Sequence, residues 1–123
     1  MINKTAEKFF NEEWGDRDMK IHSECVIEAC LGMTVNTNLD KDIFIISGWI
    51  HDMGRKEDKD NHHIISINYL DKFLSMHPEF SGLRKEIEDC IINHRSGKIP
   101  RTIYGKVFQL ADKVALLNRR WIK

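Results

Sequence analysis

Apolar residues recur at spacings of three and four along almost the whole chain, and Gly, Asn or Pro collect where this pattern breaks. Such spacing is typical of amphipathic helices, whereas the alternation expected of strands is scarce. The pattern therefore predicts an all-α chain that folds as a compact bundle of about six helices. The expected helices span residues 3–14, 18–31, 39–52, 62–76, 82–95 and 102–120.

Several expected helix ends carry residues that suit a boundary. Gly32 and Gly54 follow the second and third helices, where glycine commonly ends a helix. Side chains that can accept hydrogen bonds from free backbone amides precede three helices. These expected caps are Asn36 or Asn38 for the third helix, Asn61 for the fourth and Ser81 for the fifth.

The segment IFIISGWI, residues 43–50, is almost continuously apolar, and a run of this length suits a buried strand as well as a buried helix. The acidic first turn at Asp40 and Asp42 and the helical neighbours favour a helix. A helix that is apolar all round lies in the centre of a bundle. His51 and Asp52 are then delivered at the end of a central element.

Three polar side chains fall on helix faces that should be apolar. His22 shares its face with apolar residues three, four, seven and eleven positions later, ending at Met33, and His94 is preceded by apolar residues at the same offsets. Asp112 lies on a stripe that runs to Leu116 and carries no Lys or Arg. We therefore expect two imidazoles and one carboxylate to point into the core.

A single buried histidine is more often a hydrogen-bonded core residue than a metal ligand. An isolated buried carboxylate, however, costs many kcal/mol as an ion, and a buried imidazole needs partners for both ring nitrogens. A divalent metal ion accepts neutral imidazole and ionised carboxylate and cancels the buried negative charge. Several such side chains together therefore favour a shared metal site.

Composition limits the classes of protein that fit. A chain of 123 residues with 41% hydrophobic content can build one core, so we expect a single domain over residues 1–123. Lys plus Arg and Asp plus Glu number 19 each, so no overall positive charge draws the chain to nucleic acid.

Cysteine usage and the N-terminal sequence suggest a compartment. The cysteines Cys25, Cys30 and Cys90 are odd in number and lack C-x-x-C spacing, as expected of reduced, buried thiols in a cytosolic protein. The first residues resemble neither a signal peptide nor a transit peptide, and no uncharged stretch is long enough to span a bilayer. We expect a cytoplasmic protein that does not enter membranes.

The order His22, His51-Asp52 and Asp112 resembles the H…HD…D signature of the histidine-aspartate (HD) superfamily of metal-dependent phosphohydrolases, which are all-helical. The local sequences are similar too. IHSECVIEA resembles the family's first motif helix, SGWIHDMGR its HD-containing turn and QLADKVALL its closing aspartate helix. The resemblance covers about residues 17–117, nearly the whole chain.

Two further histidines match family members that bind two metals. His62 lies four residues before Ser66, and His94 lies near the end of the following helix. Periodicity does not distinguish His62 from its neighbour His63, so the choice of His62 rests on family spacing. The resemblance implies a binuclear site in which Asp52 bridges, with His22, His51, Asp52 and Asp112 on one metal and His62 and His94 on the other.

Mixed imidazole and carboxylate ligation suits Mn, Fe, Co, Ni or Zn better than Mg or Ca. One or two such ions lower the pKa of a bound water, which attacks a phosphate ester. Asp52 and Arg55 are the expected catalytic residues, since Arg55 stands where relatives carry a phosphate-contacting Lys or Arg. Further basic residues could bind a small anionic substrate at the mouth of the site, although loop charges are more often only solvated: Arg95, Lys98, Arg101 and Lys113.

The expected function is a phosphomonoesterase or phosphodiesterase that acts on a small nucleotide-like or other phosphorylated metabolite. The same ligand pattern also occurs in di-iron oxygenases resembling myo-inositol oxygenase. A third hypothesis is a non-catalytic sensor domain. Such domains usually lack some of the metal-ligating residues, and none is missing here. The first helix, with Phe9, Phe10 and Trp14, is expected to cover its own core, and a homodimer contact is the alternative.

Overall fold

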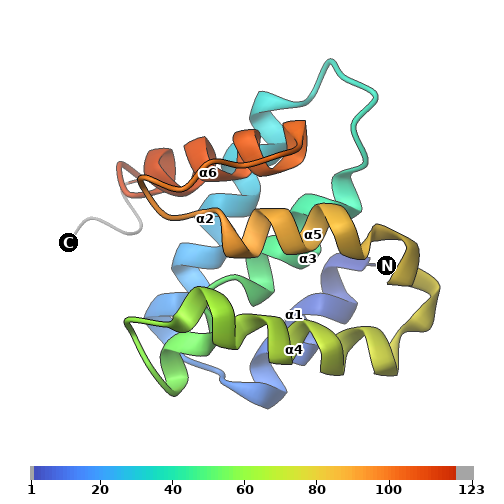
Figure 1. Cartoon of the computed structure of the whole chain (residues 1–123), viewed down its shortest axis with the longest axis vertical. Helices are drawn as coiled ribbons and strands as arrows, with labels where there is room; N and C mark the ends of the chain where they lie inside the picture. The colour runs from blue at the N-terminus through green and yellow to red at the C-terminus, as the bar shows by residue number, and fades with distance from the viewer. Residues whose placement is uncertain (1, 119–123) are drawn as a thin grey trace.

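The structure, a computed structural model, describes residues 2–118 (Figure 1). Within these residues the chain is helical and contains no strand, which confirms the all-α prediction. The elements in chain order are α1 (Ile2–Glu13), α2 (Arg17–Met33), α3 (Lys41–Ile50), the 3-10 helix η1 (Met53–Lys56), α4 (His62–Met76), the 3-10 helix η2 (Pro78–Leu83), α5 (Arg84–Ile92) and α6 (Ile103–Ala115).

Helix α3 is the centre of the bundle. It packs against each of the other five α-helices, and every residue of the apolar segment 43–50 is buried. In Figure 1 its ribbon lies behind α5 and is surrounded by the other helices. Burial on all sides explains why the segment lacks a polar face, as the sequence predicts.

Helix α1 covers one side of this core. Its buried Phe9 and Phe10 contact Phe73 and Trp49, with ring centroids 5.3 Å apart in both pairs. The indole Nε1 of Trp49 donates a hydrogen bond to Oδ1 of Asn3 at 3.0 Å, which satisfies the polar atom of an otherwise apolar side chain. The aromatic residues of α1 therefore cover the core of their own chain.

The ends of α3 differ from the prediction. The Asp40 carboxylate caps the helix by accepting a hydrogen bond from the amide of Asp42 at 3.0 Å, so the predicted caps Asn36 and Asn38 are wrong. The helix ends at Ile50, and the chain then turns into η1. Asp40 has the shorter path to the free amides, since it directly precedes the first helical residue.

Other predicted boundaries also need correction. Gly32 is no stop, because it lies inside α2, and the helix is closed by Thr34, whose hydroxyl donates to the carbonyl of Cys30 at 2.7 Å. Ser81 is no cap, because it lies within η2, which begins at a proline and runs directly into α5. Asn61 precedes α4, but its side chain binds Asp58 instead of capping the helix. The predicted last residues of the sixth helix, 119–120, lie outside the described residues.

A buried carboxylate that the sequence analysis missed holds the start of α6. Asp89 on α5 accepts hydrogen bonds from the amides of Arg101 and Thr102, from the Thr102 hydroxyl and from Asn93, at 2.7–3.1 Å. Burial acts to raise the pKa of Asp89, but these hydrogen bonds outweigh burial and lower it. The fully bonded carboxylate therefore fixes the segment between α5 and α6.

The three cysteines are buried thiols that form no disulfide within the described residues, as predicted. Burial, followed by the charge of Asp112, raises the pKa of Cys30 to about 12, so its thiol stays protonated. Among the described helices, none has the length and the apolar character that crossing a bilayer requires.

The turn that carries His51 and Asp52 packs tightly against α4. The hydroxyl of Ser66 accepts a hydrogen bond from the amide of Gly54 at 2.8 Å and donates one to the carbonyl of His51 at 2.9 Å. A Cβ atom at Gly54 would lie 2.3 Å from the backbone oxygen of His62. Gly54 is therefore required for close approach of two backbones, and the prediction that it ends the third helix is wrong.

We expect Gly54→Ala to destabilise the protein by about 2 kcal/mol, because the added methyl forces the turn away from α4. Gly32→Ala is the matched control, since nothing lies within 4 Å of its added Cβ. In α2 this control should be neutral or stabilise by about 0.5–1 kcal/mol. Urea unfolding of both variants measures the difference, and equal effects would contradict the close approach.

Candidate metal centre

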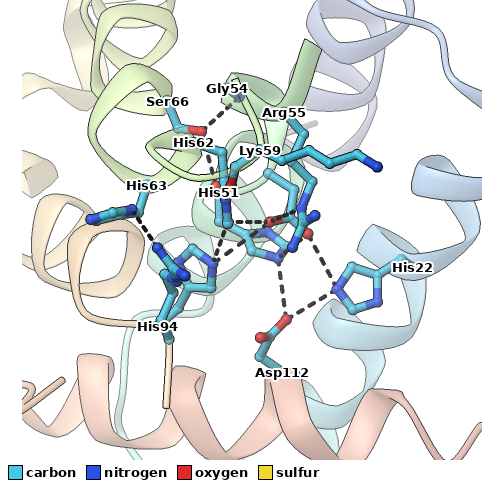
Figure 2. A network of polar contacts seen from close by, with 12 residues as sticks. His22, His51, Gly54, Arg55, Lys59, His62, His63, Ser66, His94 and Asp112 are labelled. Atoms are coloured by element: carbon cyan, nitrogen blue, oxygen red, sulfur yellow. Dashed lines mark hydrogen bonds and ion pairs between the residues drawn. The ribbon is translucent and has the colours of Figure 1, made fainter. Parts of the chain in front are cut away.

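Six histidine and aspartate side chains meet inside the bundle (Figure 2). They come from α2, from the turn between α3 and η1, from the first residue of α4, from the turn after α5 and from α6. Their ligand atoms form two groups, and within each group all atoms lie within 4.8 Å of one another. One group contains His22, His51, Asp52 and Asp112, and the other contains Asp52, His62 and His94.

Asp52 belongs to both groups because its two oxygens face in different directions. Oδ2 lies 3.4 Å from Nε2 of His22 and 3.1 Å from Nε2 of His51. Oδ1 lies 3.1 Å from Nε2 of His62 and 3.6 Å from Nε2 of His94. The carboxylate therefore offers one oxygen to each histidine group.

Asp112 closes the first group from α6. Its Oδ1 lies 3.0 Å from Nε2 of His22 and 3.3 Å from Nε2 of His51. Its side chain keeps 21% exposure, so Asp112 lies at the open edge of the site and not fully in the core. Two other predicted buried positions, Met33 and Leu116, are 39% and 48% exposed, because they lie at the ends of their helices.

Backbone carbonyls fix the ring nitrogens of three histidines. In each of them Nδ1 lies at hydrogen-bond distance from a carbonyl oxygen, which can only accept, so Nδ1 carries the proton. In the neutral ring Nε2 is then a bare lone pair directed into the site. The three pairs are His51 with Gly48 at 2.9 Å, His62 with Lys59 at 2.7 Å and His94 with Ile91 at 2.6 Å.

These lone pairs require a positive charge between them. Nε2 of His62 lies 3.1 Å from Nε2 of His94, and two acceptors cannot bond to each other. The buried Nε2 of His51 makes no well-directed hydrogen bond, although two carboxylate oxygens lie near it. Ligands at 2.0–2.1 Å from one ion are separated by about 3.0–3.4 Å. The close contacts between ligand atoms in the cluster, at 3.0–3.6 Å, fit a metal ion.

Electrostatics of the cluster lead to the same conclusion. Burial of His51 acts to lower its pKa, but the negative charges of Asp52 and Asp112 outweigh burial and raise it to about 10. Burial acts to raise the pKa values of both carboxyls, and the surrounding histidines nevertheless hold them well below the ordinary range. Without a metal ion, His51 would carry a proton between Asp52 and Asp112. A divalent cation at the same position would balance the charge of both carboxylates.

Arg55 lies at the mouth of the cluster. Its Nε donates a hydrogen bond to Oδ1 of Asp52 at 3.2 Å, and its side chain is 39% exposed. One edge of the guanidinium is therefore attached to the shared carboxylate while the side chain reaches solvent.

The other predicted substrate-binding residues lie farther out. Arg95 donates to the backbone oxygen of Asp60 at 2.9 Å and faces Nδ1 of His63 at 3.4 Å. Lys98 is exposed in the loop after His94, and Lys113 is exposed in the last turn of α6. Neither lysine forms an ion pair with any described residue.

The structure also separates the two adjacent histidines of α4. His62 points into the second group, whereas His63 lies beside it with ring centroids 6.0 Å apart and is directed toward Arg95. Both rings are buried, which is why periodicity alone did not distinguish them.

Gln109 supports the site and was missed by the sequence analysis. The two N–H groups of its side-chain amide are shared among the backbone oxygens of Asn93, Arg95 and Lys98, at 3.2, 2.9 and 2.9 Å. The loop that carries His94 is thereby tied to α6. One feature of the sequence could have identified Gln109. It lies three residues before Asp112, which places both side chains on one helix face.

A family model described as HD domain matches residues 19–117, which is most of the chain. The chain belongs to the HD domain family. The match contains all six clustered residues and leaves α1 outside. No curated protein and no solved structure matches the chain. HD domain proteins are largely metal-dependent phosphohydrolases, so the family and the histidine-aspartate cluster together indicate divalent metal binding.

Metal binding should release a proton from His51. Below pH 10 the metal-free site holds that proton, whereas a metal ion needs the Nε2 lone pair. Apparent metal affinity should therefore rise with pH and level off above about 10. Calorimetric titration of zinc at pH 8, in two buffers of different ionisation enthalpy, should show a buffer-dependent heat. His77→Asn should leave this heat unchanged, and a heat independent of the buffer would contradict the assignment.

Proposed function

We propose that this HD domain protein is a metal-dependent phosphohydrolase, a phosphomonoesterase or phosphodiesterase that acts on a small nucleotide-like or other phosphorylated metabolite. The observation that carries the proposal is the position of Asp52, whose two oxygens face two separate histidine groups. A carboxylate in this position suits two cations that act together on one phosphoryl group. The family to which the chain belongs supports the same chemistry.

Two divalent ions would be held by the two groups. His22, His51 and Asp112 would bind the first and His62 and His94 the second, with Asp52 shared between them. The mixed nitrogen and oxygen set suits Mn, Fe, Co, Ni or Zn. The three Nδ1 hydrogen bonds to carbonyls keep the rings in the tautomer that such ions require.

Bound divalent ions lower the pKa of water and stabilise negative charge on phosphoryl oxygens. The chain itself supplies position and charge. Its histidines are buried, whereas Asp112 and Arg55 are partly exposed, so solvent reaches the cluster beside these two residues. Arg55 donates one N–H group to Asp52, which leaves the guanidinium nitrogens Nη1 and Nη2 for phosphoryl oxygens.

A small anionic substrate fits this charge distribution better than a polyanion. The basic side chains that we assign to substrate binding, Arg55, Arg95, Lys98 and Lys113, are local features of a chain with equal numbers of acidic and basic residues. We also place the protein in the cytoplasm, and its three buried cysteine thiols, which form no disulfide within the described residues, support this location.

Asp52→Asn should reduce phosphate-ester hydrolysis at least about 100-fold, since even residues outside the ligand shell cost 10- to 100-fold when replaced. Asp71→Asn, which removes a carboxylate from an exposed ion pair, is the control and should retain activity. Phosphate release from a panel of phosphorylated metabolites, with Mn, Co, Ni, Fe or Zn added, measures both variants.

Activity that survives Asp52→Asn would contradict the mechanism. Oxygen uptake by the iron-loaded protein without phosphate release would instead identify an oxygenase on the same fold.

Arg55→Ala should lower kcat/KM by roughly 10- to 100-fold, the effect of losing a hydrogen bond to a charged phosphate. Lys56→Ala is the matched control, because this neighbouring cation donates to the backbone oxygen of Glu13 and does not reach the cluster. Steady-state kinetics with the best substrate compare the two, and an equal loss in both variants would exclude a specific role for Arg55.

A further inference from the structure

A second pair of side chains lies next to the His62–His94 pair. His63 directly follows one of these histidines and Arg95 the other, and Nη1 of Arg95 lies 3.4 Å from Nδ1 of His63. Figure 2 shows His63 on the same side of the cluster as His94 and away from Asp112. The two pairs are therefore neighbours at one end of the site.

The second pair presents hydrogen-bond donors. A guanidinium can only donate, so Nδ1 of His63 accepts from Arg95 and the ring proton is on Nε2. This Nε2–H group and the remaining N–H groups of Arg95 can both donate to an anion. His63 is only 7% exposed, so its orientation is set by packing.

Arg95 and Lys98, at this end of the site, form no ion pair with the residues that the structure describes. The lysine and arginine ion pairs of residues 2–118 involve Lys20, Arg55, Lys72 and Arg84. Lys98 is close enough to contribute to the field at His63. An arginine beside an imidazole, with no carboxylate partner, is suited to an external anion.

The arrangement is held in place before any ligand binds. Arg95 is fixed by its hydrogen bond to the carbonyl of Asp60, and its own carbonyl accepts from Gln109 at 2.9 Å and from the amide of Lys98 at 3.2 Å. A prearranged cation loses less conformational entropy on binding than a solvated surface side chain. Arg95 thus differs from the exposed lysines of the chain.

We infer that His63 and Arg95 form a second phosphate subsite, and that the substrate carries at least two phosphate groups, one at the metal cluster and one at this pair. The inference rests on the proposed function for the first phosphate. The ring centroids of His62 and His63 are 6.0 Å apart, so the second group would bind one side chain away from the reacting phosphate. The substrate class is therefore a bisphosphate or diphosphate metabolite.

Binding of matched nucleotides to the manganese-loaded full chain tests this subsite without requiring turnover. Adenosine 5′-monophosphate supplies one phosphate, and adenosine 5′-diphosphate and adenosine 3′,5′-bisphosphate supply a second at two different separations. Calorimetric titration should give at least one doubly phosphorylated nucleotide a Kd roughly 10-fold or more below that of the monophosphate.

Arg95→Ala should remove this preference, with a 10- to 100-fold weaker Kd for the doubly phosphorylated nucleotide and less than about a 2-fold change for the monophosphate. Arg95→Lys keeps the positive charge but loses the paired N–H groups of the guanidinium. Its Kd for the doubly phosphorylated nucleotide should lie between those of the wild-type protein and Arg95→Ala. His63→Ala should weaken the same nucleotide by a smaller factor. Arg84→Ala is the matched control, because this arginine begins α5 and pairs with Asp71 and Glu88.

Three results separate the two proposals. Equal affinity of the wild-type protein for all three nucleotides, or equal weakening of all three by Arg95→Ala, would overturn the second subsite even if hydrolysis is observed. A preference that depends on Arg95, in a protein that hydrolyses no phosphate ester, would support the subsite and overturn the hydrolase. A preference that Arg95→Ala removes, in a wild-type protein that hydrolyses phosphate esters, would support both.

Discussion

The site depends on one carboxylate, Asp52, which is buried among four imidazoles. Each of its oxygens lies 3.1 Å from a histidine nitrogen on a different side, so this residue belongs to both histidine groups. Its negative charge and that of Asp112 balance the positive charge of any cation in the cluster. Replacing Asp52 by an uncharged residue would leave Asp112 as the one carboxylate of the cluster and would remove all negative charge from the second histidine group.

The rest of the fold keeps this arrangement in place. Helix α3 is buried on all sides and delivers His51 and Asp52 at its end, where Ser66 and the close approach at Gly54 fix the turn against α4. Backbone carbonyls hold the rings, and Gln109 ties the His94 loop to α6. Without a cation, this arrangement holds acceptor atoms close together, such as Nε2 of His62 and Nε2 of His94. Such departures from local rules are common at functional sites.

Much of the fold followed from periodicity because five helices bury one face and α3 buries every face. The ends of α3 and α5 were less predictable, because the choice between Asn38 and Asp40 as a cap, or between Ser81 and a 3-10 turn, depends on tertiary packing. For the site, His22 and His94 stood out as polar residues on apolar faces. The separation of His62 from His63 and the role of Gln109 depend on side-chain directions in three dimensions, which spacing does not encode.

The most direct test of a metal centre built on Asp52 is the position of bound metal in a crystal of the manganese-loaded protein, located by anomalous scattering. We expect two peaks, one on each side of the Asp52 carboxylate, within coordination distance of the two histidine groups. Absence of a peak beside Asp52, or metal bound only at surface carboxylates, would contradict this expectation.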